Sequence, residues 1–313
     1  MKKILVIGSS NTDLITRVKN FPAPGETIVG KEYLEVMGGK GANQAMASHR
    51  LGGKVQFISC LGDDANGKNA LAYYQQEGLN ASSSLIVNGI ASGTAIIIVD
   101  EQGENSIIIT PGANNKLSST YLSSIENSIS EADIMLLQME IPYETVKEAC
   151  AMAKKNGTKV ILNVAPARPI DNELLKNIDI LVVNETEAET ISGEKIDNIG
   201  KEEVVNLLLE KGVHTVVLTL GKKGCYFKDN ERSMHLGAFE VEAVDTTAAG
   251  DTFCGALAAE IARGKSWEDS LIFATAASAI CITKMGAQPS IPKEKEVRAF
   301  LNENIISVQN IKK

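Results

Sequence analysis

Short apolar runs alternate along the chain with segments of helical periodicity. The runs lie at residues 4–7, 55–60, 134–138, 159–163, 180–183 and 215–220, and most of them end at Gly or Asn. Unbroken apolar runs of this length predict parallel strands that are buried on both faces. Helical patterns lie at residues 42–51, 143–155, 201–211, 252–261 and 267–283. This alternation predicts an α/β fold with three layers, αβα, built on a mostly parallel, doubly wound sheet.

Two segments break the alternation. Residues 15–37 lack helical periodicity and contain β-prone pieces at 15–18 and 27–29. Residues 94–99 and 106–110 flank a polar turn sequence, which is a hairpin signal. We expect residues 15–37 and 94–110 to form a small β-sheet lid over the mouth of a site. The α/β core would then consist of residues 1–14, 38–93 and 111–313.

Composition and charge narrow the partners. The chain has 313 residues, of which 44% are apolar and 22% charged, as in ordinary globular proteins. The net charge of −8 and the lack of a long Lys/Arg cluster argue against nucleic acid or a membrane as partner and favour a small molecule. Five scattered cysteines predict reduced core thiols and a cytoplasmic location. No apolar run has the length of a signal peptide or a membrane span.

The stretch from Val244 to Asp251 carries the clearest candidate chemistry. It places small residues between Asp245 and Asp251 and runs directly into a helical pattern. The first turn of a helix has unpaired N–H groups and a partial positive charge, so small residues there let an anion approach the backbone. If the anion is a transferring phosphoryl group, Asp251 stands where a base accepts the proton of the attacking hydroxyl. Taken alone, the segment favours a simpler interpretation, the N-terminal cap of an ordinary helix.

Polar residues also follow the predicted strands. Asn11 and Asp13 come just past the first strand, at the sheet edge where α/β proteins bind ligands, and are candidate ligands for polyol hydroxyls. Asx chemistry in a turn explains them equally well. The glycines from Gly38 to Gly41 precede a helix and permit close backbone approach to a ligand, with Asn43 beside it. They fit neither the dinucleotide fingerprint nor the phosphate loop that ends in Lys-Ser/Thr.

Further candidates lie in the second half of the chain. Asn184 and Glu187 stand three residues apart where a strand gives way to a helix, a spacing that suits direct or water-mediated contacts to Mg²⁺. A helix cap with first-turn acids is the alternative. Glu140 and Thr219 also lie at strand ends, and the loop at residues 284–290 has backbone oxygens free to bind a ligand.

Nine stretches in order match one family. They are 8–13 (GSSNTD), 22–27 (PAPGET), 38–45 (GGKGANQA), 62–64 (GDD), 163–167 (NVAPA), 184–189 (NETEAE), 219–221 (TLG), 245–253 (DTTAAGDTF) and 286–290 (GAQPS). On these motifs the chain resembles the ribokinase/PfkB family of carbohydrate kinases over nearly its whole length. The resemblance implies a ribokinase-like fold with a β lid. It also implies ATP-dependent phosphorylation of D-ribose at the 5-hydroxyl, which gives D-ribose 5-phosphate and ADP.

The resemblance also implies roles for residues. Asp251 would be the catalytic base, with an anion hole made by the backbone N–H groups of Ala248, Ala249 and Gly250. The implied sugar ligands are Asn11, Thr12, Asp13, Gly38, Gly39, Lys40, Gly41, Asn43 and Glu140, together with Asp251. The implied ATP side is Asn184, Thr219, Leu220, Gly221, Lys222, Lys223, Gly224, Gly250 and Thr275, with Glu187 linked to Mg²⁺. The implied K⁺ activator site is Asp245, Thr247, Cys281, Lys284, Gly286 and Ser290, several of them acting through backbone carbonyls.

Some features of the family leave alternatives open. Cys254 and Thr275 stand where relatives often carry Asn and sometimes His, respectively. A homodimer formed through the exposed lid sheet is implied. A related kinase acting on deoxyribose, fructose, a nucleoside or a sugar acid is the main alternative, and a non-catalytic sugar or nucleotide sensor is another. The pair Asn11 and Asp13 favours ribose over 2-deoxyribose, because a site built to bind a hydroxyl rejects the analogue that lacks it. A dehydrogenase is disfavoured because no G-x-G-x-x-G follows the first strand.

Overall fold

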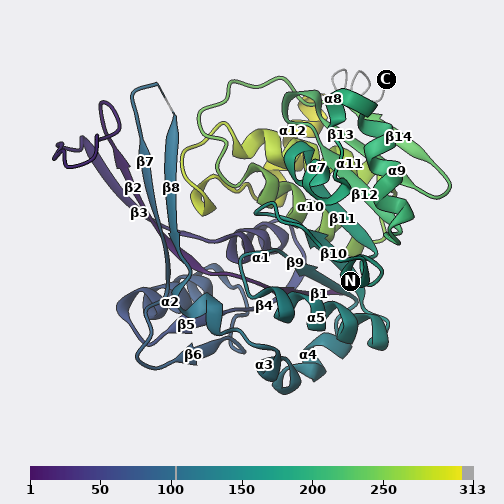
Figure 1. Ribbon diagram of the computed structural model, residues 1–313, viewed down its shortest axis with the longest axis horizontal. Helices are drawn as coiled ribbons and strands as arrows, with labels where there is room; N and C mark the ends of the chain where they lie inside the picture. The colour runs from purple at the N-terminus through teal and green to yellow at the C-terminus, as the bar shows by residue number, and fades with distance from the viewer. Residues whose placement is uncertain (103, 305–313) are drawn as a thin grey trace.

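A computed structural model describes residues 1–102 and 104–304 of the chain (Figure 1). Within these residues the main sheet has eight strands. Their spatial order is β14 (Ser233–Leu236), β13 (Cys225–Asp229), β12 (Thr215–Thr219), β11 (Ile180–Asn184), β10 (Lys159–Asn163), β9 (Ile134–Leu137), β1 (Lys3–Ile7) and β4 (Lys54–Ile58). Neighbours from β12 to β4 are parallel, and β13 and β14 add an antiparallel edge.

Helices cover both faces of this sheet, because the strands are apolar on both faces. In β1, for example, Ile4 and Val6 join one buried cluster while Leu5 and Ile7 join the other. The first face is covered by α1 (Lys40–Arg50), α2 (Ala65–Glu77), α10 (Ala249–Ala262), α11 (Trp267–Cys281) and α12 (Glu294–Glu303). The second is covered by α3 (Ser119–Ser124), α4 (Glu126–Ser130), α5 (Tyr143–Asn156), α6 (Asn172–Leu175), α7 (Glu185–Ser192), α8 (Ile196–Ile199) and α9 (Lys201–Glu210). The predicted three-layer αβα fold is confirmed.

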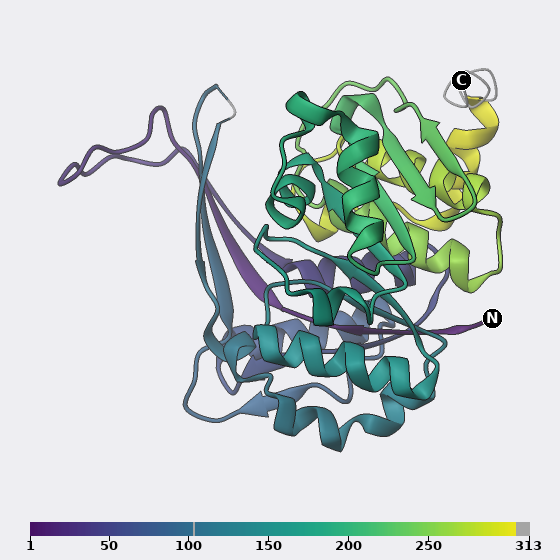
Figure 2. The same ribbon diagram turned by 45° about the vertical axis from the view of Figure 1, so that its right-hand side comes forward.

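The small sheet stands away from one side of the core, and both views show this (Figures 1 and 2). Its strands, in spatial order, are β3 (Glu32–Gly38), β2 (Asn11–Arg17), β7 (Gly93–Val99) and β8 (Asn105–Thr110). A separate parallel pair, β5 (Cys60–Gly62) and β6 (Leu85–Val87), lies beside the core. Single 3₁₀ turns are η1 (Gly112–Lys116), η2 (Gly221–Lys223) and η3 (Gln288–Ser290). We refer to β3, β2, β7 and β8 as the lid sheet.

The expectation of a strand at residues 27–29 is wrong. Those residues belong to no strand, and β3 begins only at Glu32, opposite Arg17 of β2. The backbone N–H of Lys31 donates to the carbonyl of Arg17, so pairing along β2, rather than local β propensity, decides where the second strand starts. The hairpin between β7 and β8 is confirmed, while Gly103 of its predicted turn lies outside the described residues.

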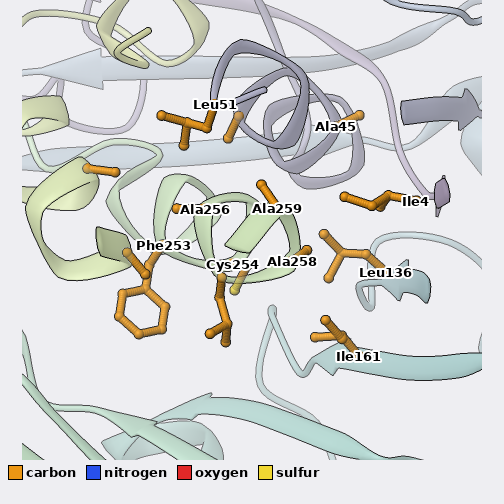
Figure 3. Close-up of a cluster of buried hydrophobic side chains, with 14 of the residues drawn as sticks. Ile4, Ala45, Leu51, Leu136, Ile161, Phe253, Cys254, Ala256, Ala258 and Ala259 are labelled. Carbon is orange, nitrogen blue, oxygen red and sulfur yellow. The ribbon is translucent and has the colours of Figure 1, made fainter. Parts of the chain in front are cut away.

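Helix α10 occupies the middle of the first helical layer. Figure 3 shows its residues Phe253, Cys254, Ala256, Ala258 and Ala259 among residues of α1 and of the strands, including Ile4, Leu136 and Ile161. A side chain on Gly255 would lie 2.8 Å from the backbone of α1, so only glycine lets the two helices approach this closely. In the part of the chain that the structure describes, no helix has the length and apolar character needed to cross a bilayer.

Candidate active site

Asp251 lies in the first turn of α10 and is only 7% exposed. One carboxylate oxygen accepts a hydrogen bond from Asn43 Nδ2 at 3.0 Å, and the other accepts from Gln44 Nε2 at 2.9 Å. The N-cap position belongs to Ala248, and no side chain caps the helix. The simpler interpretation of Asp251 as a helix cap is therefore wrong, since its carboxylate points towards α1.

The approach to α10 is built from small residues. Ala248 has φ 60°, a left-handed conformation that costs a non-glycine residue roughly 1–2 kcal/mol, and it turns the chain into the helix. The N–H of Ala249 donates to the carbonyl of Thr246 at 3.2 Å, so of the three implied anion-hole groups this one already has an acceptor. Gly250 is exposed, and an added side chain there would meet nothing within 4 Å. The first turn is thus open to a ligand.

The first residues of β2 bring the implied sugar ligands to the same place. Strand alternation puts Asn11 and Asp13 on one face and turns Thr12 to the other. Asn11 pairs with Gly38 of β3, where a Cβ would collide with the Asp13 carboxylate. Both Asn11 and Asp13 are buried, with exposed fractions of 4% and 6%. Glycine at position 38 is required because the carboxylate takes the space that a side chain would fill.

The start of α1 closes against the turn after β1. Gly39 has φ 87°, and a Cβ on Gly41 would lie 2.5 Å from the backbone of Gly8. One oxygen of Glu140 accepts from the backbone N–H of Lys40 at 3.0 Å and from Ser9 Oγ at 2.6 Å. Glu140, which follows β9, therefore fixes the N-terminus of α1 beside the implied sugar site.

Burial and crowding of carboxylates change the titration of this cluster. Burial, with Glu140 and Asp251 nearby, raises the pKa of Asp13 to about 7 against the opposing effect of Lys40. Burial lowers the pKa of Lys40, but Asp251, Glu140 and Glu187 outweigh it, so this pKa lies above its usual value. Lys40 is therefore a positive charge held among four carboxyl groups.

Two sets of buried amides, which the sequence did not single out, support the cluster. Asn114 Nδ2 donates to Asn11 Oδ1 at 2.7 Å, and Asn114 Oδ1 accepts from the Ser10 N–H at 3.0 Å. Gln44 links Asp251 to Gln138 and Asn163. Gln44 and Asn163 lie inside the matched motifs, whereas Asn114 and Gln138 carry no sequence signal, because their roles depend on contacts between segments far apart in the chain.

A cavity of about 480 Å³ lies at the N-terminus of α10, where Ala249, Gly250 and Phe253 line it. Among the residues implied to bind ATP, it is lined by Thr219, Gly221, Lys222, Gly224, Gly250 and Thr275. Leu220 and Lys223 line a different hollow, together with Glu185 and His235. Gly224 has φ 87°, and a Cβ there would collide with the Leu236 carbonyl, so only glycine fits at this position in the cavity wall. The cavity is therefore a candidate nucleotide site that reaches Gly250, the residue before Asp251.

Asn184 and Glu187 form a reciprocal cap on α7. Asn184 Oδ1 accepts from the Glu187 N–H at 2.8 Å, and the two Glu187 oxygens accept from Asn184 N and Nδ2 at 2.8 and 3.0 Å. The helix-cap alternative is thereby confirmed as part of their role. Burial raises the pKa of Glu187 to about 7, although the Asn184 hydrogen bond and Lys40 oppose this and Asp251 adds to it. Glu187 is 6% exposed and faces the charged cluster.

Asp245 joins two loops next to the first turn of α10. Its carboxylate oxygens accept from the N–H groups of Thr247 and Gly286, both at 2.9 Å. The N–H of Val244 donates to the Ile282 carbonyl at 2.8 Å, just past α11. The fold therefore brings residues 244–247 against residues 282–286, as the resemblance implies for a monovalent-cation site.

The other implied cation positions lie close by. Cys281 Sγ lies 3.0 Å from Ser290 Oγ and 3.7 Å from the Thr247 carbonyl. The Lys284 ammonium points away from them and pairs with Glu296 at 2.8 Å. One carboxylate together with loop carbonyls is the kind of oxygen donor set that replaces the hydration shell of K⁺. The residues present fit such an ion.

Comparison with known sequences identifies the family. The profile described as pfkB family carbohydrate kinase matches residues 1–294. A ribokinase of Haemophilus influenzae is 43% identical over 301 residues, which cover 96% of this chain and 98% of the relative. A deoxyribokinase of Salmonella typhimurium is 34% identical over 303 residues, which cover 96% of this chain and 99% of that protein.

Solved structures agree with this. A ribokinase of Thermotoga maritima has a TM-score of 0.90 at 40% identity, with 96% of this chain and 100% of that chain covered. The Arabidopsis thaliana ribokinase complexed with ribose and ATP has a TM-score of 0.89 at 36% identity, with 96% and 98% covered. The ribokinase-like fold is confirmed. The chain therefore belongs to the pfkB family of carbohydrate kinases.

Proposed function

We propose that the protein transfers the γ-phosphoryl group of ATP to the 5-hydroxyl of D-ribose, giving D-ribose 5-phosphate and ADP. The observation that carries this proposal is the position of Asp251. Its carboxylate is hydrogen-bonded to Asn43 and lies near Asp13, while the residue before it, Gly250, lines the 480 Å³ cavity. A base with an acceptor site and a donor site on its two sides suits phosphoryl transfer.

In the reaction, Asp251 accepts the proton of the sugar hydroxyl while the hydroxyl oxygen bonds to the γ-phosphorus. The bond from that phosphorus to the oxygen bridging the β-phosphate breaks, and ADP leaves. The open N–H groups at the start of α10 hold the transferred group, and Lys40 offsets the negative charge of the surrounding carboxylates. Positioning therefore supplies most of the rate.

Two cations accompany this proposal. Bound Mg²⁺ neutralises phosphate charge, and we place Asn184 and Glu187 near it, most simply through water. A monovalent cation, K⁺, would be held by Asp245 and the carbonyls of the loops at 244–247 and 284–290, adding a fixed positive charge near the first turn of α10. The five cysteines are buried and free, which supports a cytoplasmic location.

A homodimer through the lid sheet is also proposed. The row Ile15, Leu34, Ile97 and Ile107 lines a cavity of about 610 Å³ that faces core residues 243–247. Alternation turns the row Leu14, Ile96 and Ile108 to the outer face, where Ile96 and Ile108 are 43% and 57% exposed. An apolar outer face of this kind favours contact with a second copy.

A coupled assay of ATP turnover tests the proposed reaction. In K⁺ buffer we expect turnover with D-ribose and at least about tenfold lower kcat/KM with 2-deoxy-D-ribose or D-fructose. Replacing K⁺ by Na⁺ should lower the rate. The Asp251→Asn variant should lose about a hundredfold or more in kcat while still binding ribose by calorimetry.

The outcomes separate the alternatives. Faster turnover with deoxyribose or fructose would reassign the substrate within the family. Ribose binding without turnover by the wild-type chain would favour a sensor, and near-normal turnover by Asp251→Asn would remove Asp251 as the base.

A further inference from the structure

Gln44 is a fully buried amide in the first helical layer. Its Nε2 donates two hydrogen bonds, to Asp251 Oδ1 at 2.9 Å and to Asn163 Oδ1 at 3.0 Å. Its Oε1 accepts from Gln138 Nε2 at 2.7 Å. Every polar atom of the Gln44 side chain is therefore paired, and one of its partners is the carboxylate that we propose as the base.

The orientation of this amide is fixed from the backbone outward. Asn163 Nδ2 donates to the carbonyl of Val182 at 3.1 Å, and a carbonyl can only accept. Asn163 must therefore turn its Oδ1 towards Gln44, which in turn must present its NH₂ group. A flipped Gln44 would set its Oε1 against two acceptors, the Asn163 oxygen and the Asp251 carboxylate. The direction of the hydrogen bond to Asp251 is thus determined.

The network is retained at a cost. Among the described residues, Gln138 Oε1 is buried without a hydrogen-bond partner, because Gln138 uses its amide group to hold Gln44. A buried unpaired acceptor destabilises a protein. A purely structural explanation, in which three amides only satisfy one another, does not account for the hydrogen bond that ends on Asp251.

We propose that Gln44 is a positioning residue that fixes the plane of the Asp251 carboxylate for proton transfer. Asn43 donates a hydrogen bond to one carboxylate oxygen and Gln44 to the other, so adjacent residues of α1 hold both oxygens of the proposed base. This inference rests on the proposed role of Asp251. Asn43 is itself an implied sugar ligand. When the sugar engages Asn43, Gln44 is the residue that stays hydrogen-bonded to Asp251.

Three variants test the proposal. Gln44→Met keeps the length of the side chain and removes the donor, and we expect kcat to fall roughly ten- to a hundredfold while the Kd values of ribose and ATP change less than about threefold. Gln44→Glu provides a donor only when its carboxyl group is protonated, so its activity relative to wild type should rise as the pH falls. Ser48→Ala is the control, because the buried Ser48 bonds to the Gly255 carbonyl in the same helix contact and not to Asp251.

The pH profile of kcat at saturating ribose and ATP separates positioning from packing. Gln44→Met should move the acidic limb of this profile to higher pH by about one unit, because the carboxylate form of Asp251 loses a hydrogen-bond donor. The ionisable groups around Asp251 are Asp13, Lys40, Glu187, Cys254 and Cys281, from β2, α1, α7, α10 and α11. The wild-type, Gln44→Met and Ser48→Ala enzymes all keep these ionisable groups. A difference between their pH profiles therefore reports on Gln44.

Each outcome decides the matter. A Gln44→Met enzyme with kcat within twofold of wild type and an unchanged limb overturns the proposal, even if its melting temperature falls. If Gln44→Met does not fold, Gln138→Met removes only the group behind Gln44 and should shift kcat in the same direction by a smaller factor; no shift there would also overturn it. A wild-type chain that phosphorylates no sugar would instead reject the proposed function.

Discussion

The folded state disfavours ionisation of the Asp13 carboxyl group. Burial and the neighbouring carboxylates raise its pKa from 3.8 to about 7. Because the folded state binds this proton more tightly than the unfolded state, the contribution of Asp13 to stability is most favourable below about pH 4 and falls as the pH rises to about 7. A sugar hydroxyl that donates to the carboxylate would relieve this penalty, so the group is prepared for a ligand at the expense of the free protein.

Asp13→Asn tests this at the residue scale. The variant should gain unfolding free energy relative to wild type, by an amount that grows between pH 4 and pH 7, levels off above that and is at most about 4 kcal/mol. Its KM for ribose should rise about tenfold or more. Chemical denaturation of the ligand-free proteins across this pH range provides the measurement. A stability difference that does not change with pH would contradict the prediction.

Helix α10 depends on one glycine to reach α1. A Cβ on Gly255 would lie 2.8 Å from the Gln44 carbonyl and from the Ser48 N–H. Gly255→Val should therefore push the helices apart, costing about 1–3 kcal/mol of stability and weakening the hydrogen bonds from α1 to Asp251. We expect a lower melting temperature and a fall in kcat of at least about tenfold at a temperature where the variant is folded. Ala151→Val is the control, because it adds bulk at an exposed position of α5, where the backbone is also helical. A variant at Gly255 that loses stability but keeps full kcat would show that the close approach serves packing alone.

The elements that the sequence predicts well are those whose own pattern determines them. The strand at residues 4–7 and the helix at 143–155 are apolar in the register of their structures, and both appear as β1 and α5. Strand β3 is largely exposed and is defined by pairing with β2, so its start was misplaced. At the site, motifs identified Asp251 and Asn43, but not the amides Gln138 and Asn114. Their hydrogen bonds join residues about a hundred positions apart, and local patterns hold no information about them.

The two faces of the lid sheet provide the test of assembly. Ile108 lies on the outer face and Ile107 on the face towards the core, and they are similarly exposed, at 57% and 52%. We expect the wild type to have twice the 33.4 kDa chain mass in solution. Ile108→Lys should reduce this to a single chain, while Ile107→Lys should leave it unchanged. Sedimentation velocity at micromolar concentration distinguishes these results, and a wild-type monomer would refute the dimer.

The residues of the two proposed binding sites come from different halves of the chain. The residues around the proposed sugar, from Asn11 to Glu140, all precede β10, whereas those lining the cavity next to Gly250 begin at Thr219. Substitutions in the first half of the chain can therefore change the sugar that is bound while the residues lining the cavity next to Gly250 stay the same. Asp251 is the exception, because it belongs to the second half of the chain but is hydrogen-bonded to Asn43 and Gln44 of the first half. A change of sugar must therefore preserve the contact of α1 with α10 that holds this carboxylate.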